Sequence, residues 1–211
     1  MKVLLVNGSP HTHGCTFTAL SEIAATLEKE GVTAEIFQLG TKALPGCISC
    51  GKCGELGKCV FDDQVNVFTD AAAKADGFVF GSPVHYAAAG GAITSFLDRV
   101  FFSTMNAGRR ENFYLKPAAA VVSARRGGTT AALDQLNKYF TISEMPVISS
   151  KYWNMVHGFT PEDVKKDLEG LQVMRVLGRN MAWFLKCKEA GQKAGVSLPA
   201  TEKSVMTNFI D

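Results

Sequence analysis

Three stretches of this chain are apolar at every position, and they constrain the fold more than any other feature. They are residues 3–6 (Val-Leu-Leu-Val), 78–80 (Phe-Val-Phe) and 118–122 (Ala-Ala-Ala-Val-Val). A strand with one face in water alternates apolar and polar residues, so a continuous apolar run indicates a strand buried on both faces. Such strands are typical of a parallel sheet covered by helices on both sides. We therefore expect an α/β fold.

Helical patterns lie between these runs, where apolar residues recur three or four positions apart. The remaining predicted elements are helices at 16–30, 63–75, from 91 onward and at 130–140, an alternating strand at 33–39 and a short strand at 146–148. Strands and helices that alternate in this way predict right-handed βαβ crossovers. The expected core is a doubly wound parallel sheet of five strands.

Residues 150–211 are predicted to form a C-terminal extension that contains one long helix. Thr160 suits the N-cap of this helix, and Pro161 suits its first position. Apolar residues then follow three or four apart, at Leu168, Leu171, Met174, Leu177, Met181 and Leu185. No repeat, low-complexity tract or linker is evident, so residues 1–211 are expected to form a single domain.

Charge and composition exclude several classes of partner. The 211 residues are 46% hydrophobic, and the 22 Lys and Arg residues nearly balance the 20 Asp and Glu residues. Such a balance creates no strong field, so neither nucleic acid nor a membrane is expected as a partner. The first apolar run ends at Gly8, too early for a signal peptide or a membrane span, and predicts a cytoplasmic location.

The loop from Gly8 to Thr16 connects the first strand to the first helix, where unpaired N–H groups and the helix dipole favour an anion. It lacks both the G-x-G-x-x-G pattern of dinucleotide sites and the G-K-[ST] pattern of nucleotide P-loops. A monophosphate is therefore the better candidate. In the alternative interpretation, Ser9 and Thr16 only cap the helix.

Two more strand ends carry candidate binding residues. The third strand is predicted to end at Gly81 and to continue into Ser82–Tyr86, and the fourth leads into Ser123–Thr129. In a sheet of order 2-1-3-4-5, ligands bind at the carboxyl ends of the strands, beside the switch point between strands one and three. All three loops are expected to meet there.

These motifs resemble the NAD(P)H-dependent FMN reductase and flavodoxin-like superfamily, in particular its iron-sulfur flavoprotein branch, over nearly the whole chain. The resemblance implies that FMN is bound. It implies that the phosphate is held by Ser9, His11, Gly14, Cys15 and Thr16, the flavin and ribityl chain by Ser82, Pro83, Val84, His85 and Tyr86, and the far edge of the ring by Ser123, Ala124, Arg125, Arg126, Gly127 and Gly128. His11 and Cys15 depart from the usual Arg and Asn.

Four of the six cysteines, Cys47, Cys50, Cys53 and Cys59, crowd into the predicted loop at 42–62, an insertion after strand two. Such crowding favours a metal site or thiol chemistry over a disulfide framework. Structural zinc sites usually have two separated C-x2-C pairs, whereas successive two-residue gaps are more typical of iron-sulfur ligation. The resemblance implies a [4Fe-4S] cluster, with zinc or metal-free thiols as the alternatives.

Three further residues are candidates near the flavin: His85, Arg125 and His157. Arg125 and its neighbour Arg126 suit the flavin ring, an anionic substrate or the NADPH phosphate, although a solvated pair explains them equally well. The segment 152–158 is expected to cover the flavin, or else to contain a buried Trp and His. In such a protein the flavin performs the chemistry, so no catalytic triad is required, and none is evident.

Two functions remain open on these grounds. In the first, the protein is an enzyme in which FMN takes a hydride from NAD(P)H and reduces a small acceptor such as a quinone or a flavin. In the second, FMN and the cluster form an electron-transfer module fed by ferredoxin. Simple flavodoxins of that sort are markedly acidic, whereas this chain has a pI of about 8.2, which favours the enzyme. A plain nucleotide-binding fold is a third possibility. The resemblance also implies a homo-oligomer, either a dimer or a tetramer.

Overall fold

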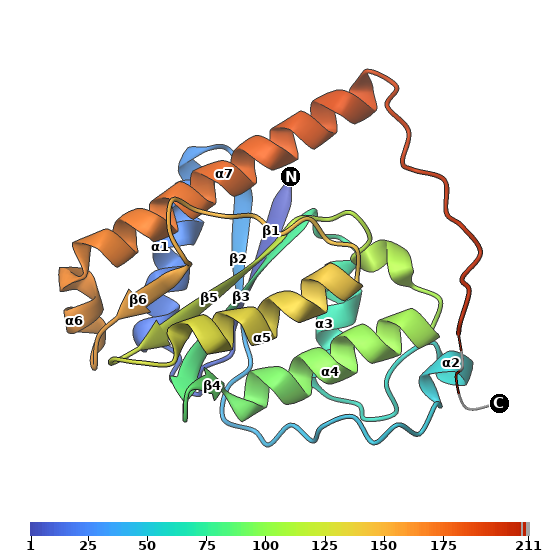
Figure 1. Cartoon of the computed structure of the whole chain (residues 1–211), viewed down its shortest axis with the longest axis horizontal. Helices are drawn as coiled ribbons and strands as arrows, with labels where there is room; N and C mark the ends of the chain where they lie inside the picture. The colour runs from blue at the N-terminus through green and yellow to red at the C-terminus, as the bar shows by residue number, and fades with distance from the viewer. Residues whose placement is uncertain (208, 210–211) are drawn as a thin grey trace.

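A parallel sheet forms the centre of the computed structural model, which describes residues 1–207 and 209. The end of the expected 150–211 extension therefore lies outside the described residues. The strands are β1 (Lys2–Asn7), β2 (Thr33–Gln38), β3 (Gly77–His85), β4 (Ala88–Ala89), β5 (Ala118–Ala124) and β6 (Met155–His157). Five are parallel in the order β2-β1-β3-β5-β6, and β4 pairs antiparallel with the end of β3 (Figure 1). The α/β class is confirmed, but the sheet has six strands, not five.

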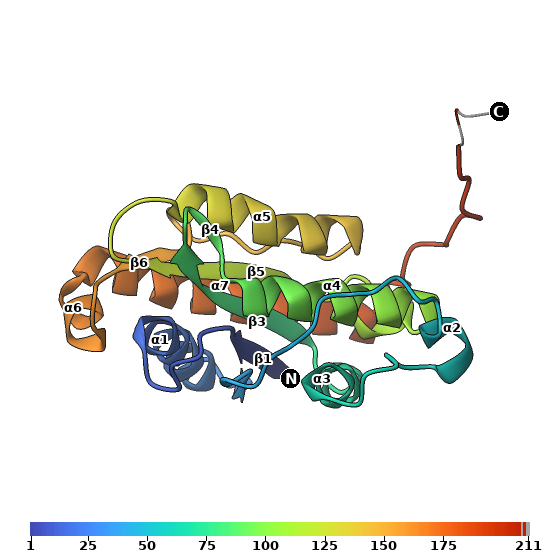
Figure 2. The same ribbon diagram turned by 90° about the horizontal axis from the view of Figure 1, so that it is seen from below.

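Helices cover both faces of the sheet, as the apolar runs predict. The helical elements are α1 (Cys15–Lys29), α2 (Cys53–Leu56), α3 (Gln64–Ala72), α4 (Gly91–Asn106), a 3-10 turn (Arg110–Asn112), α5 (Thr129–Ile142), α6 (Pro161–Lys166) and α7 (Leu168–Lys193). Leu4 and Phe80 belong to the apolar core on the side of α3, α4 and α5, while Leu5 and Val79 belong to the core beneath α1 and α7. Figure 2 shows α5 and α1 on opposite sides of the sheet.

The fifth parallel strand is not where the sequence predicts it. Residues 146–148 make only one isolated bridge, between Val147 and Ala118, whereas β6 pairs with the end of β5. Pro146 has no N–H to donate, so a ladder cannot continue on both sides of Val147. The strand forms instead at Met155–His157, where Val156 is fully buried and Met155 is buried as well.

The third strand extends past Gly81, its predicted end. Ser82 and Pro83 still pair with β5, and Val84 and His85 then pair with β4 in a hairpin. Pro83 is tolerated because it lies near the end of the strand, where a missing N–H costs little. Residues 82–85 are therefore part of a strand and not of a loop, and Tyr86 is the one predicted binding residue of this segment that lies in the turn.

The long C-terminal helix is interrupted once, contrary to the sequence-based expectation. Asp167 separates α6 from α7, and its carboxylate accepts hydrogen bonds from the backbone N–H groups of Gly170 at 2.9 Å and His157 at 2.7 Å. Asp167 thus caps α7 as a new helix start, which a continuous helix would not allow. Among the described residues no helix, the 26-residue α7 included, is both long and apolar enough to cross a membrane.

Candidate functional site

The loop after β1 is held by the side chains of Asn7 and Gln38, which the sequence analysis did not identify as site residues. The Asn7 amide donates to the Gln38 side-chain oxygen at 2.6 Å and to the His11 carbonyl at 3.3 Å, and its oxygen accepts from the Ser9 N–H at 3.1 Å. Gln38 in turn donates to the Ser9 carbonyl at 2.8 Å. These bonds fix the turn that leads into α1, because three of them satisfy backbone groups of Ser9 and His11 that would otherwise be unpaired.

The N-terminus of α1 is open to a ligand. Gly14 is the N-cap residue, and no side chain caps the helix there. Ser9 accepts from the His11 N–H at 3.2 Å, and the Thr16 hydroxyl lies 2.8 Å from the Ser123 hydroxyl. The interpretation of Ser9 and Thr16 as mere helix caps is therefore wrong. The first N–H groups of α1 and the positive end of its dipole remain available to an anion.

The register of the strands brings the predicted loops together. Asn7 at the end of β1 pairs with Gly81, and Pro83 on β3 pairs with Ser123 on β5. At the next strand, Ala124 pairs with His157. The Thr16–Ser123 contact then joins the start of α1 to the end of β5. The three strand ends thus meet at one edge of the sheet, as predicted.

The β3–β4 hairpin forms one wall of this edge. Its turn residues Tyr86 and Ala87 have positive φ angles of 49° and 61°, and the Tyr86 side chain is fully exposed. Gly128, with φ of 92°, packs against this turn, and an added Cβ on it would lie 2.5 Å from the Ala87 Cα. Non-glycine residues with positive φ are strained, and such strain persists where the surroundings impose it, often at ligand sites.

The remaining predicted residues lie around the same edge. Arg125, Arg126 and Gly127 are exposed in the loop between β5 and α5, and His85 is exposed on the hairpin. His157 is exposed at the end of β6, with its Nδ1 atom 4.0 Å from an Asp167 carboxylate oxygen. Two hollows open here. They are lined by His11–Cys15 with Phe159–Pro161, and by Gly8, Pro10, Pro83 and His85 together with Gly40–Leu44.

Cys15 occupies the first position of α1, where its thiol donates to the Gly158 carbonyl at 3.7 Å. Burial raises the pKa of the Cys15 thiol, and the nearby Asp163 and Glu162 carboxylates raise it further. The thiol therefore stays neutral at ordinary pH. A neutral side chain at this position adds no negative charge that would repel a phosphate.

The four clustered cysteines form a second candidate site between β2 and α3. All four line one hollow, together with Arg99, Phe102 and Ser103 of α4. The short helix α2 begins at Cys53, and Gly51 and Gly57, which flank it closely, adopt left-handed backbone conformations. The loop thus turns sharply enough for all four cysteines to line the same hollow.

Side chains from the neighbouring helices hold this loop. The Asn66 amide of α3 accepts from the Cys59 N–H and donates to the Cys59 and Phe61 carbonyls, each at 3.0 Å. The Arg99 guanidinium donates to the Cys59 sulfur through Nε at 3.4 Å and through Nη2 at 3.3 Å. Burial disfavours its charge, but hydrogen bonds to Asp63 and Cys59 outweigh burial and raise the pKa of Arg99.

The four thiols are soft ligands, a donor set that suits an iron-sulfur cluster or a zinc ion. Among the described residues, no three His, Cys, Asp or Glu side chains are placed to hold one metal ion. Thiolates on one zinc, each at about 2.3 Å, lie close together, whereas the thiolates of a [4Fe-4S] cluster bind four different irons and stand further apart. In this chain four thiols line one hollow, and two of them accept N–H hydrogen bonds from Arg99 and Asn106.

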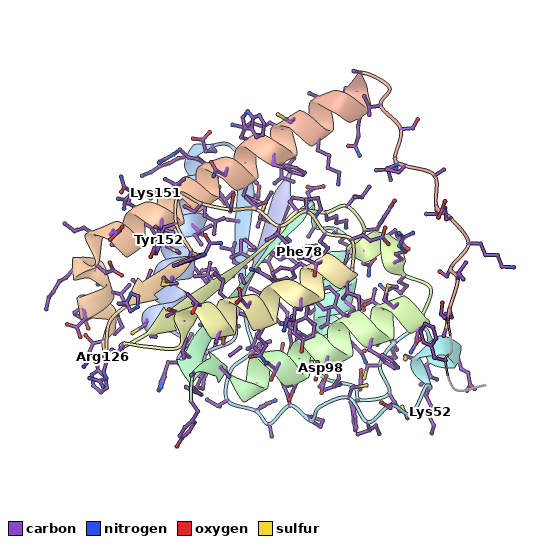
Figure 3. The ribbon with its side chains drawn as sticks, in the orientation of Figure 1. Lys52, Phe78, Asp98, Arg126, Lys151 and Tyr152 are labelled. Atoms are coloured by element: carbon purple, nitrogen blue, oxygen red, sulfur yellow. The ribbon has the colours of Figure 1, made fainter. Side chains whose placement is uncertain are left out.

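The two sites lie at opposite ends of α4. Gly91, its first residue, borders a hollow at the carboxyl edge of the sheet, and Ser103, near its other end, borders the cysteines. The 16 residues of α4 span about 24 Å at 1.5 Å per residue. Figure 3 shows the same separation, with Arg126 beside the sheet edge and Lys52 in the cysteine loop at the far side of the molecule.

Comparison with known proteins places the chain in a family. The family model of the NADPH-dependent FMN reductases matches residues 1–160, which include both sites. The chain belongs to this family. Its resemblance to the iron-sulfur flavoproteins is also confirmed, because such a protein from Methanocaldococcus jannaschii is 31% identical over 191 residues, which is 88% of this chain and 98% of the relative.

Solved structures agree with this membership at the level of the fold. RosB, crystallised with bound 8-demethyl-8-formylriboflavin-5'-phosphate, superposes with a TM-score of 0.66 and 15% identity over 100% of this chain and 94% of its own. An archaeal flavodoxin has a TM-score of 0.56 and 17% identity over 88% of this chain and 99% of its own. The protein therefore has the flavodoxin-like fold of its family.

Sequence reasoning missed the residues that support the two sites. Asn7 and Gln38 hold the loop after β1, and Asn66, Arg99 and Asn106 hold the cysteine loop. Two signals were available. Asn7 directly follows a fully apolar run, and Arg99 falls on the apolar face of α4 between Phe96 and Val100. A polar residue in an apolar stripe usually has a buried partner.

Proposed function

We propose that this protein binds FMN at the carboxyl edge of its sheet and uses it as an oxidoreductase. The observation that carries this proposal is the uncapped N-terminus of α1 facing three converging strand ends. The family membership supports it, because the family is that of the NADPH-dependent FMN reductases. The proposed FMN ligands are residues 9, 11 and 14–16 for the phosphate, 82–86 for the ribityl chain and flavin, and 123–128 for the far edge of the ring.

Each part of this site has a physical role in the proposal. The N–H groups at the start of α1 bind the phosphate dianion, helped by the Ser9 and Thr16 hydroxyls. The hairpin turn and Gly128 form a wall for the ring, and Arg125 adds positive charge beside it. FMN, when bound, supplies the hydride and electron chemistry, so His85, Arg125 and His157 serve to bind and orient rather than to react.

In the proposed reaction, a hydride from NAD(P)H reduces the enzyme, which then reduces a small acceptor such as a quinone or a free flavin. The open carboxyl edge supports this, because the exposed Arg125 and Arg126 can bind the phosphates of a dinucleotide. The decisive test is anaerobic mixing of the FMN-loaded protein with NADH or NADPH. Bleaching of the flavin absorbance is expected, and reduction by ferredoxin but by neither nucleotide would overturn the proposal.

A second function is favoured by the cysteine site. Here Cys47, Cys50, Cys53 and Cys59 hold a [4Fe-4S] cluster, and the protein is an electron-transfer module fed by ferredoxin. Four thiols around one hollow and the iron-sulfur flavoprotein relative support this alternative. Iron and sulfide analysis after anaerobic reconstitution tests it. About four irons per chain are expected, and an iron-free protein with intact flavin would eliminate the cluster.

A homo-oligomer, either a dimer or a tetramer, is also proposed. Electron transfer weakens steeply with distance, and the two sites of one chain are separated by the length of α4. Exposed apolar side chains that line the cysteine hollow, Ile48, Val60 and Phe102, offer a contact surface for a second copy. Sedimentation analysis of the reconstituted protein tests this, and a monomer at micromolar concentration would contradict it.

A cytoplasmic location is part of the same proposal. All six cysteines are free of disulfides, which suits a reducing compartment. A fluorescent fusion expressed in the source cells tests this point, and export of the fusion would contradict it.

A further inference from the structure

Arg99 is the largest side chain of the described residues that is fully buried, with only 1% of its surface exposed. It lies on α4, on the face that packs against the cysteine loop. An arginine is almost never buried so completely unless its charge is paired. Here Nη1 and Nη2 bind the two carboxylate oxygens of Asp63 at 2.7 Å and 2.9 Å. The ion pair satisfies the charge but uses only part of the guanidinium.

The rest of the guanidinium faces the cysteine site. Its Nε and Nη2 groups both donate to the Cys59 sulfur, and its remaining contacts are the Pro45 and Phe61 carbonyls at 3.4 Å and 3.5 Å. Its central carbon also lies 4.8 Å from the centre of the Phe61 ring. A planar fork can bind a carboxylate on one edge and a sulfur on another, which the single ammonium of lysine cannot do.

We propose that Arg99 is a positioning residue for the cysteine site, one that fixes the Cys59 sulfur and makes the bound cluster easier to reduce. This inference rests on the proposed [4Fe-4S] cluster. Reduction adds negative charge to the cluster and its sulfur ligands. Hydrogen bonds to those sulfurs therefore stabilise the reduced form more than the oxidised form, and the reduction potential rises.

The surroundings strengthen this effect. Arg99 and Asp63 carry opposite charges, so the pair is neutral as a whole and acts on the sulfur chiefly through its directed N–H groups. Since Arg99 is excluded from water, these bonds act in a medium of low dielectric constant, where they are stronger. A second donor, the Asn106 amide, reaches the Cys53 sulfur at 3.6 Å from the last turn of α4. One helix thus supplies N–H donors to two of the four sulfurs.

The test compares variants that separate the sulfur contacts from the ion pair. Arg99→Lys keeps the positive charge but removes the fork that binds Cys59. Asp63→Asn breaks the ion pair but keeps Arg99 on the sulfur, and asparagine can still cap α3 as Asp63 does through the Val65 N–H. Arg175→Met serves as the control, because it removes a guanidinium paired with Glu22 on the other face of the sheet.

The readouts are the midpoint potential of the cluster, from a redox titration followed by electron paramagnetic resonance, and the melting temperature. Both Arg99→Lys and Asp63→Asn are expected to melt earlier than the wild type. The potential should shift to a more negative value in Arg99→Lys, but to the same or a more positive value in Asp63→Asn. Arg175→Met should leave it unchanged. If Arg99 had a purely structural role, the midpoint potential would shift in the same direction in Arg99→Lys and Asp63→Asn.

Two results would overturn the inference: an unchanged potential in folded Arg99→Lys, or equal negative shifts in Arg99→Lys and Asp63→Asn. If Arg99→Lys does not fold, the double variant Arg99→Gln/Asp63→Asn replaces it, since it leaves no unpaired buried charge. Its midpoint potential must then be more negative than that of Asp63→Asn. Wild-type protein that takes up no iron and sulfide would instead overturn the cluster itself, a failure seen before any potential is measured.

Discussion

The two candidate sites of this protein are built in different ways. At the sheet edge, backbone segments approach one another so closely that Gly8 and Gly128 have no room for a side chain. In the cysteine loop, an added Cβ on Gly51 or Gly57 would meet no atom within 4 Å, and the chain is held by the side chains of neighbouring helices. One site depends on close backbone packing, and the other depends on hydrogen bonds from a few polar residues.

This difference predicts opposite sensitivities. The sheet edge should tolerate the loss of a side-chain atom better than the gain of one, because overpacking shifts the backbone groups that bind a ligand. The cysteine loop should respond mainly to the loss of its polar anchors, because buried backbone groups then lose their partners. The variants below test whether damage to one site stays confined to it.

The largest effect is expected from Asn66→Ala in the cysteine loop. The substitution leaves the Cys59 N–H and the Cys59 and Phe61 carbonyls without their partner, at a cost of about 3 kcal/mol. Iron uptake on reconstitution should be lost, while FMN affinity should stay at the wild-type value. Iron analysis and flavin fluorescence titration measure the two.

Asn180→Ala is the matched control for this variant, because it removes an amide that makes a single exposed hydrogen bond, to Ser149. It should affect neither cofactor. Loss of FMN affinity in Asn66→Ala would show that the two sites are not independent.

Gly8→Ala should have the next largest effect, and at the other site. The new Cβ would lie 2.7 Å from both the Gly81 carbonyl oxygen and the Ile93 Cβ, so the loop after β1 must move. Overpacking of this kind costs about 2 kcal/mol, which corresponds to roughly thirtyfold weaker FMN binding. Fluorescence titration measures the affinity, and iron uptake should be unchanged. Gly191→Ala on the open side of α7 is the control, and a folded Gly8→Ala with wild-type affinity would contradict the prediction.

Thr16→Val should weaken FMN binding less. Valine keeps the shape of threonine but removes the hydroxyl that contacts Ser123 and is proposed to contact the phosphate. One lost hydrogen bond is worth about 1 kcal/mol, or roughly fivefold in affinity. Thr16→Ser, which keeps the hydroxyl, should bind FMN almost as well as the wild type. Equal affinity of the Val and wild-type proteins would remove Thr16 from the site.

Much of the fold could be predicted from the sequence, because burial on both faces of a strand leaves a direct mark on the residues. The strands at 3–6, 78–80 and 118–122 and the helices between them form where the apolar patterns predict them. The strand at Met155–His157 left no such mark, because it has only three residues and only two of them are apolar. The helix break at Asp167 depends on a contact with the distant His157 N–H. Local periodicity does not contain that contact.

The candidate sites divide in the same way. The cysteines and the glycine-rich loops can be recognised because their chemistry and spacing are local features of the sequence. The partners of the supporting residues cannot be recognised, since Arg99 and Asn66 contact residues that the fold brings to them from the cysteine loop. A single arginine on a helix usually lies in water, and only the tertiary structure shows that this one is buried beside a sulfur.

The smallest effect is expected in thiol reactivity. One labelling experiment on metal-free protein compares the cysteines of the two sites. Cys47 and Cys50 are exposed, whereas Cys15 is half-buried and burial raises the pKa of its thiol. Because only the thiolate reacts, iodoacetamide should label Cys47 and Cys50 first and Cys15 later, and the Cys15 rate should keep rising above the pH at which an ordinary thiol is ionised. Peptide mass spectrometry over time and pH measures this, with Cys15→Ser as the control. Labelling of Cys15 as fast as Cys47 would mean that the start of α1 is more open than its packing indicates.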